Sequence, residues 1–231
     1  MKRKRIKAAV CAAVMAFTLF GSLCPVDYHF MRETSVTASA EAAIWDGTED
    51  TSWYYREHDV VVSENGERIA IFNIRTAEEL AGLAKLVRNG NNMKNTMINL
   101  VSDVTLNDTT NFDNWDEQPP ANNWTAIGAV PIEAPNVNVV MTIQPECRNT
   151  VFAGMFNGNG HTISGMYSLH HNYAGLFART SGIITNVIVK DSYIQCINTQ
   201  KVESGDTALW EACAGGITAI CDRGVISHCE F

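Results

Sequence analysis

Hydrophobic and polar positions alternate in two short runs of the chain. The runs, residues 60–63 and 68–74, are joined by Glu64-Asn65-Gly66. A period of two residues is typical of a strand with one buried face, and a short connection containing Asn-Gly is a hairpin signal. The pattern therefore predicts a β-hairpin over this segment.

The apolar positions change to a helical spacing after residue 75. Thr76-Ala77-Glu78-Glu79 has the form of a capping box. The apolar positions that follow recur three or four residues apart, until Asn89-Gly90 ends the pattern: Leu80, Leu83, Ala84 and Val87. We expect one amphipathic helix over residues 77–89. Because the open end of a stack of strands needs a cover with a polar outer face, residues 41–95 are expected to form an N-terminal cap.

Residues 151–231 contain strings that match one another, which indicates an internal repeat. Residues 152–156 match residues 173–177 at an interval of 21 residues, and a third copy begins at residue 214. Residues 182–189 also match residues 224–231. In this second match Ile184 aligns with Ile226 and Val187 with Cys229, which predicts that Cys229 occupies a core position.

Short repeated strands with glycine turns predict an all-β fold. We expect a right-handed parallel β-helix, that is, a solenoid, over residues 96–231, with the hairpin and the amphipathic capping helix before it. From Gly175 to Gly216 the interval is 41 residues, so residues 198–206 are expected to form a side loop or a degenerate repeat. The stretch 107–149 is expected to form one or two strands and a protruding loop.

The last strand, residues 225–231, is apolar and has no cap after it. An uncapped stack exposes its core and its pairing edge. We therefore expect the chain to be a fragment of a longer one, and its C-terminal end to aggregate or fray.

The first residues have the order of a secretory signal peptide. Residues 2–7, of which five are basic, precede an apolar run over residues 8–23, which is shorter than the ~20 residues of a membrane-spanning helix. Ala38-Ser39-Ala40 supplies the small residues of a cleavage site. Residues 1–40 are thus predicted to be a signal peptide, and the mature protein to be extracellular or at the cell surface without membrane insertion.

Charge restricts the partners of the mature chain. The full sequence carries 17 basic and 25 acidic residues, and cleavage after Ala40 would leave 11 and 23, a formal net charge of −12. A surface of this sign repels phosphate backbones and anionic lipids. We expect no nucleic-acid partner, and a glycan or an extracellular protein as the ligand.

Five cysteines follow the predicted cleavage site, without the C-x-x-C spacing of zinc or thioredoxin-like sites: Cys147, Cys196, Cys213, Cys221 and Cys229. An oxidising compartment permits one or two disulfides. The favoured interpretation is that these cysteines act as small apolar core residues. The sequence alone does not indicate a pairing.

No catalytic pattern stands out. Glycoside hydrolysis needs clustered carboxylates, and polysaccharide lyases use calcium with a basic residue. The acidic residues after residue 100 do not recur at one repeat position, and the chain has no H-E-x-x-H, G-x-S-x-G or P-loop string. His161 lies in a turn, where a hydrogen bond to a neighbouring strand is the favoured role.

Two sets of residues remain as candidate sites. Asp108, Asp113 and Asp116 lie in an oxygen-rich run that offers calcium ligands, although it lacks the glycine and glutamate of a calcium-binding loop. No other cofactor is expected. The aromatic residues Trp45, Trp53, Tyr54 and Tyr55 offer a platform on which sugar rings stack. The alternative is that these rings pack the cap onto the first strands.

Several strings of the chain resemble the GLUG-motif proteins, which are secreted bacterial surface proteins. The resemblance rests on residues 45–54, on residues 76–84, on Trp124-Thr-Ala-Ile-Gly128, and on Asn159-Gly-His-Thr-Ile-Ser-Gly165. It spans residues 45–231 and implies a right-handed parallel β-helix with no conserved catalytic set. The chain departs from the motif at Ala178 and His228.

Together these observations favour binding over catalysis. We expect a secreted or cell-surface scaffold or adhesin-like protein. The alternative is a carbohydrate-active enzyme of the polysaccharide lyase or glycoside hydrolase type. A third possibility is an accessory module of a surface peptidase, whose catalytic domain would lie beyond residue 231.

Overall fold

The computed structural model describes residues 43–128, 150–170, 173–197 and 213–231. The predicted signal peptide lies outside the described residues, as do residues 129–149 of the predicted protruding loop and the predicted side loop at 198–206. Within the described part, no helix is long and apolar enough to cross a membrane.

The hairpin and the helix are present where their patterns indicate them. Strands β1 (Asp59–Val62) and β2 (Arg68–Ile74) pair in antiparallel fashion, and helix α1 spans Ala77–Arg88. The Thr76 hydroxyl accepts a hydrogen bond from the Glu79 backbone N–H at 3.2 Å. The return bond differs from a capping box, because the Glu79 carboxylate accepts from the Arg75 backbone N–H at 2.8 Å.

Helix α1 connects β2 to a parallel neighbour, β3 (Thr96–Leu100). A parallel pair needs such a crossover, and α1 buries its apolar face beside the sheet. Leu80, Leu83 and Val87 are completely buried. At Gly82 a Cβ atom would collide with the carbonyl oxygen of Asp50, so the segment before β1 packs directly on the helix backbone.

One sheet contains six strands in the order β1-β2-β3-β5-β10-β15. The last three are β5 (Met155–Asn157), β10 (Ile183–Thr185) and β15 (Val225–Ser227), and all neighbours after β2 run parallel. The register places five apolar residues in one inward row: Phe72, Ile98, Phe156, Ile184 and Ile226. Ile98, Phe156 and Ile184 are completely buried, whereas Ile226 on the edge strand is 39% exposed.

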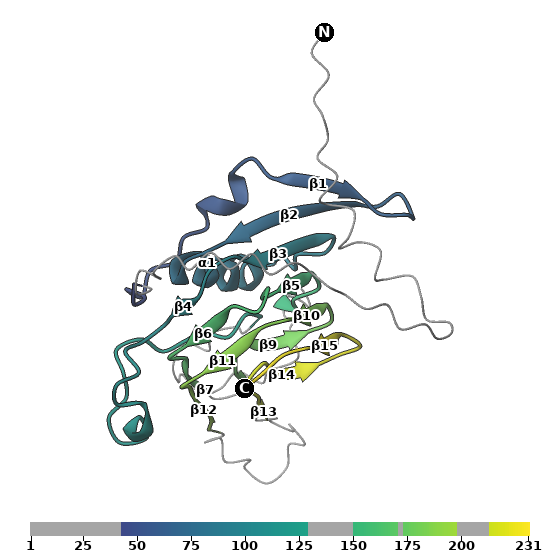
Figure 1. The fold of residues 1–231 in the computed structure, drawn as a ribbon. Helices are drawn as coiled ribbons and strands as arrows, with labels where there is room; N and C mark the ends of the chain where they lie inside the picture. Colours follow the sequence, from purple (N-terminus) through teal and green to yellow (C-terminus); the bar gives the residue numbers. More distant parts are fainter. Residues whose placement is uncertain (1–42, 129–149, 171–172, 198–212) are drawn as a thin grey trace, which may run out of the picture.

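The described residues form four smaller sheets as well, and all pairs in these sheets are parallel. One has three strands, β11 (Ile188–Lys190), β6 (Thr162–Ser164) and β4 (Val104–Thr105). The others are pairs of β12 (Tyr193–Cys196) with β7 (Tyr167–His170), β13 (Cys213–Ala214) with β8 (Tyr173–Ala174), and β14 (Thr218–Cys221) with β9 (Phe177–Thr180). Two short 3-10 helices, η3 (Ser52–Tyr55) and η4 (Phe112–Asn114), lie in the connections. Figure 1 shows the successive strands and the chain excursion that projects after β4.

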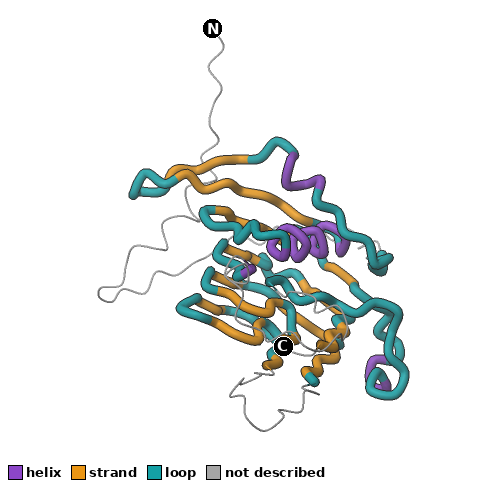
Figure 2. The backbone as a smooth tube through the Cα atoms, turned by 180° about the vertical axis from the view of Figure 1, so that it is seen from behind, coloured by secondary structure: helices purple, strands orange, loops and turns teal. Residues whose placement is uncertain are grey.

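The predicted fold class is wrong. Instead of an all-β solenoid, the described residues form several small mixed or parallel sheets with one α-helix (Figure 2). These sheets do not form a closed solenoid of the right-handed parallel β-helix type. The sheets contain six, three or two strands, and the largest begins with an antiparallel pair. Local patterns specify strands and turns, but they do not specify how many strands each sheet contains.

The 21-residue interval is also wrong. Strand β5 pairs with β10, Ile184 facing Phe156, whereas the matching string at residues 173–177 contributes to other sheets. The two Ala-Gly strings lead into strands of different sheets, which explains the misleading match. The second match is confirmed, because Ile184 pairs with Ile226 and Cys229 packs against the core.

The residue after each of the first three inward-row residues is an asparagine whose side chain points outward. Asn73, Asn99 and Asn157 occupy neighbouring strands, and Asn99 donates to Asn73 at 3.2 Å. The turn residues Asn159, Asn186 and His228 have positive φ values of 51°, 54° and 54°. Asparagine tolerates this conformation better than most residues, and His228 adopts it at the position equivalent to Asn186.

Neighbouring positions of β5 provide a matched test of the inward row. Phe156→Ala should lower the free energy of unfolding by about 3–5 kcal/mol, because Phe156 is completely buried. Met155→Ala, on the outward half-buried position, should cost about 1 kcal/mol. Urea unfolding of both variants of the full chain measures the difference. Equal losses would contradict the assigned register.

Candidate functional site

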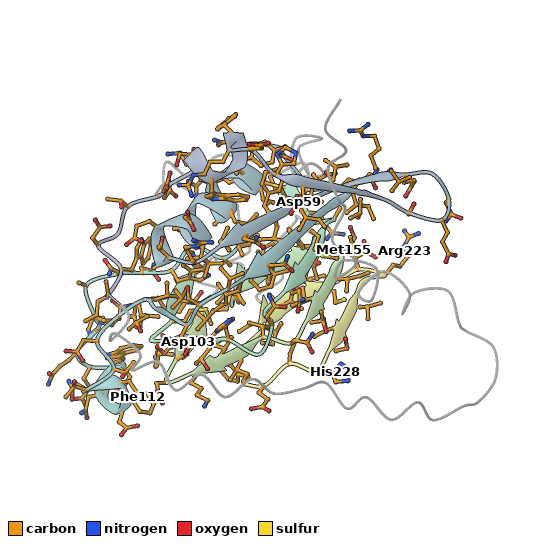
Figure 3. All side chains as sticks on the ribbon, turned by 45° about the horizontal axis from the view of Figure 1, so that its top comes forward. Asp59, Asp103, Phe112, Met155, Arg223 and His228 are labelled. Carbon is orange, nitrogen blue, oxygen red and sulfur yellow. The ribbon has the colours of Figure 1, made fainter. Side chains whose placement is uncertain are left out.

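A pocket of about 560 Å³ lies between the segment that begins at Ile44 and the excursion after β4. Ile44 forms a parallel bridge with Thr105, and the Trp45 N–H donates to the Thr105 carbonyl at 2.9 Å. The excursion carries η4, and Phe112 lies at the end of the molecule opposite Arg223 in Figure 3. The lining combines polar and apolar residues: Ile44, Trp45, Asp46, Asn107, Asp108, Thr110, Asn111, Trp115, Gln118, Pro119, Pro120, Ala121 and Asn122.

Two asparagines fix the walls of the pocket. The buried Asn107 amide donates to the carbonyls of Asn122 and Gly165 at 2.9 and 3.0 Å, and its oxygen accepts from the Asn122 N–H at 3.0 Å. The Asn122 side chain donates to the Trp45 carbonyl at 2.7 Å. These buried and partly buried hydrogen bonds join both ends of the excursion to the N-terminal segment.

Two buried tryptophans, Trp45 and Trp115, line the pocket. Trp45 is 8% exposed, donates its indole N–H to the Thr48 carbonyl at 2.7 Å and packs edge-on against Trp124. Trp115 is 2% exposed and packs edge-on against Tyr167. Because both indoles are buried, they give the pocket a rigid base rather than an open stacking face.

Two similar Asp-x-Thr turns place carboxylates at the pocket. Asp46 Oδ1 accepts from the Thr48 N–H at 2.8 Å and from its hydroxyl at 2.6 Å. Asp108 Oδ1 accepts from the Thr110 N–H at 2.9 Å and from its hydroxyl at 2.6 Å. Hydrogen bonds from the threonine hydroxyl and backbone lower the pKa of each aspartate, so both are ionised at neutral pH.

The predicted aromatic platform is divided in the structure. Trp45 lines the pocket, whereas Trp53 is 2% exposed and donates its indole N–H to the Glu79 carbonyl at 3.0 Å. Tyr54 stacks on Phe72, and Tyr55 is 78% exposed. The structure therefore does not bring these four rings onto one exposed surface.

The three predicted calcium ligands do not all line the pocket. Asp108 lines the pocket, and Asp113 and Asp116 are exposed residues of the excursion that do not line it. Among the described residues, no group of three or more His, Cys, Asp or Glu side chains is arranged to hold a metal ion. Calcium binding by these aspartates stays a prediction.

A second polar cluster lies at the turn before β6. His161 Nδ1 lies 3.0 Å from Asp103 Oδ1, which also accepts from the Thr162 N–H at 3.0 Å. The pKa of Asp103 is lowered, first by the Thr162 amide and also by the nearby His161. The contact agrees with the structural role predicted for His161, a hydrogen bond to a neighbouring segment.

Sequence reasoning missed Trp115 and the Asn107–Asn122 contact. Asp46-Gly47-Thr48 and Asp108-Thr109-Thr110 share a turn pattern that was a usable local signal. Nothing local, however, indicates that residues 45, 107 and 122 meet. The pocket arises from contacts between segments far apart in the sequence.

The Asp103 contact predicts a pH-dependent contribution to stability. A lowered folded-state pKa means that the contribution is present above the unfolded pKa, near 3.8, and is lost as the pH falls through the folded value. Asp103→Asn should cost about 1 kcal/mol near pH 6, a small value because the carboxylate is largely exposed, and its difference from the parent should shrink as the pH falls below 3.8. Urea unfolding across pH measures this, with the exposed Asp113→Asn as the control. A pH-independent gap would contradict the assignment.

Comparisons of the chain with protein-family models, with curated proteins and with solved structures find no match. Membership of the GLUG-motif proteins therefore stays a prediction, and the function has to be argued from the chemistry of the pocket.

Proposed function

We propose that this chain is an exported binding protein that holds an uncharged saccharide in the pocket beside Trp45 and Trp115, without catalysing a reaction on it. The observation that carries the proposal is the pair of ionised aspartates, Asp46 and Asp108, on a preorganised polar pocket.

The chemistry of the lining suits a ligand rich in hydroxyl groups. Carboxylates only accept hydrogen bonds, whereas the side-chain amides of Asn111 and Gln118 can both donate and accept. A hydroxyl group also does both. Hydrogen bonds from hydroxyls to carboxylates are stronger than neutral ones, and the bonds from Thr48 and Thr110 orient the two carboxylates.

The same carboxylates are unsuited to glycoside hydrolysis. Such catalysis needs a carboxylic acid whose pKa is raised, so that it protonates the leaving group. Every described carboxyl group with a resolved shift is lowered: Asp46, Glu49, Asp50, Asp103 and Asp108. The pocket lining also lacks the basic residue of a lyase, since none of its residues is Lys, Arg or His. These features support binding over the enzyme alternative.

Charge and the N-terminal sequence support the remaining parts of the proposal. The net charge of −12 after cleavage at Ala40 disfavours acidic polysaccharides and is compatible with uncharged glycans. The basic-then-apolar order of residues 2–23 supports export to the cell surface or the medium.

A saccharide-binding experiment tests the proposal. The full chain is titrated with uncharged oligosaccharides chosen from a glycan array, and binding is followed by calorimetry. Asp108→Asn keeps the acceptor for Thr110 but removes the charge, and it should weaken binding about tenfold, because a hydrogen bond to a charged group contributes more than one to a neutral group. Asp113→Asn, on the same excursion but outside the pocket lining, is the matched control and should bind like the parent.

Two outcomes would overturn the proposal. New reducing ends or unsaturated sugars in the mixture would establish an enzyme. Equal affinity of the parent and Asp108→Asn would place the ligand elsewhere, as would capture of an extracellular protein that uncharged saccharides fail to displace.

A further inference from the structure

Two cysteines lie at the ends of neighbouring strands. Cys196 is the last residue of β12, and Cys213 is the first residue of β13. In the parallel pairings Cys196 faces His170 of β7, and Cys213 faces Tyr173 of β8. His170 and Tyr173 are only three residues apart in the chain, so the register brings the two cysteines close together as well.

Direct contacts agree with the register. Strands β12 and β13 lie against each other, as Figure 1 shows. The Cys213 backbone amide is within hydrogen-bonding reach of the Cys196 sulfur. Both residues are half-buried, which limits competing reactions with large partners.

The other described cysteines have different surroundings. The Cys229 sulfur contacts the carbonyls of Ser227 and Ile184 at 3.3 and 3.9 Å, and Cys221 is exposed at the end of β14. Neither lies on the β12–β13 pair. Cys196 and Cys213 are therefore the pair that the fold itself positions.

We propose that Cys196 and Cys213 are an oxidation site, at which an intramolecular disulfide forms and joins the two ends of the segment between β12 and β13. Disulfide geometry needs Cα atoms about 4.4–6.8 Å apart. The Cys213 backbone amide lies within hydrogen-bonding reach of the Cys196 sulfur, so little movement is needed to bring the two sulfurs together. The inference goes beyond the proposed saccharide binding and does not depend on it.

The reaction uses a small disulfide, such as glutathione disulfide, as the oxidant. A protein thiolate attacks it, forms a mixed disulfide and releases one glutathione thiolate. The second cysteine loses its proton and attacks the protein sulfur of the mixed disulfide, which releases the second glutathione. The protein thus loses two electrons and two protons, and the oxidant becomes two glutathione molecules.

Burial raises the pKa of the Cys196 thiol. Less of it is ionised at neutral pH than in an exposed thiol, so formation of the bond should accelerate as the pH is raised from 7 to 9. The direction follows because the thiolate, and not the thiol, is the nucleophile.

Peptide mapping of the full chain tests the site. The protein is treated with a glutathione redox mixture at pH 8, quenched in acid, alkylated and digested with trypsin. Cleavage after Lys190, Lys201 and Arg223 puts Cys196 in peptide 191–201 and Cys213 in peptide 202–223. We expect these peptides to be linked as the major oxidised form, lighter than the separate reduced peptides by two hydrogen atoms.

Peptide 202–223 also contains Cys221, so the variant Cys221→Ser decides which cysteine is linked. The link should persist in Cys221→Ser and disappear in Cys213→Ser. Loss of the link in Cys221→Ser would overturn the proposal. Recovery of Cys196 mainly as a glutathione adduct, in both the parent and Cys221→Ser, would also overturn it. Both of these proteins retain the proposed pair, so this outcome does not depend on whether Cys213→Ser folds.

Discussion

The register of the parallel strands in the six-stranded sheet determines which side chains form the core and where the turns between the strands lie. Ile98, Phe156 and Ile184 stack in one completely buried row, with one residue contributed by each strand. A slip of one residue would turn this row outward and bury Asn99 and Asn157 in its place. Burying those amides without partners would destabilise the slipped sheet. The register is therefore strongly specified, and it fixes the positions of the turns that follow each strand.

The pocket depends on this register through a chain of contacts. The inward row positions β5, the turn after β5 leads into β6, and the Ser164 carbonyl at the end of β6 accepts from the Leu106 N–H at 2.8 Å. The next residue, Asn107, then meets the Gly165 carbonyl and Asn122. A pocket built from surface loops thus receives its geometry from the core, which explains how an exposed excursion presents fixed groups.

Sequence patterns predicted the features that depend on nearby residues. The hairpin at β1 and β2 and the helix at α1 follow from alternation, an Asn-Gly turn and the Thr76 cap, all of which act within a few residues. The pairing of Ile184 with Ile226 was also predicted, because both strings keep the same turn chemistry. The composition of the sheets was not predicted, since similar strings enter different sheets. The Asn107–Asn122–Trp45 contacts were missed for a related reason: an asparagine with a long-range partner has no local signature.

The burial of Trp45 and Trp115 bears on the kind of ligand that is proposed for the pocket. An open indole face would favour sugar rings through stacking and would equally favour cations through the π system. Trp45 and Trp115 offer neither, because they are 8% and 2% exposed. Selection must then come from the polar groups at the rim, whose two carboxylates are already oriented by Thr48 and Thr110. A carboxylate fixed in this way cannot turn to follow a ligand, so the ligand has to bring donors at matching positions. Several hydroxyl groups on one rigid ring meet that requirement better than a single ammonium group, and this is the reason for proposing a saccharide as the ligand.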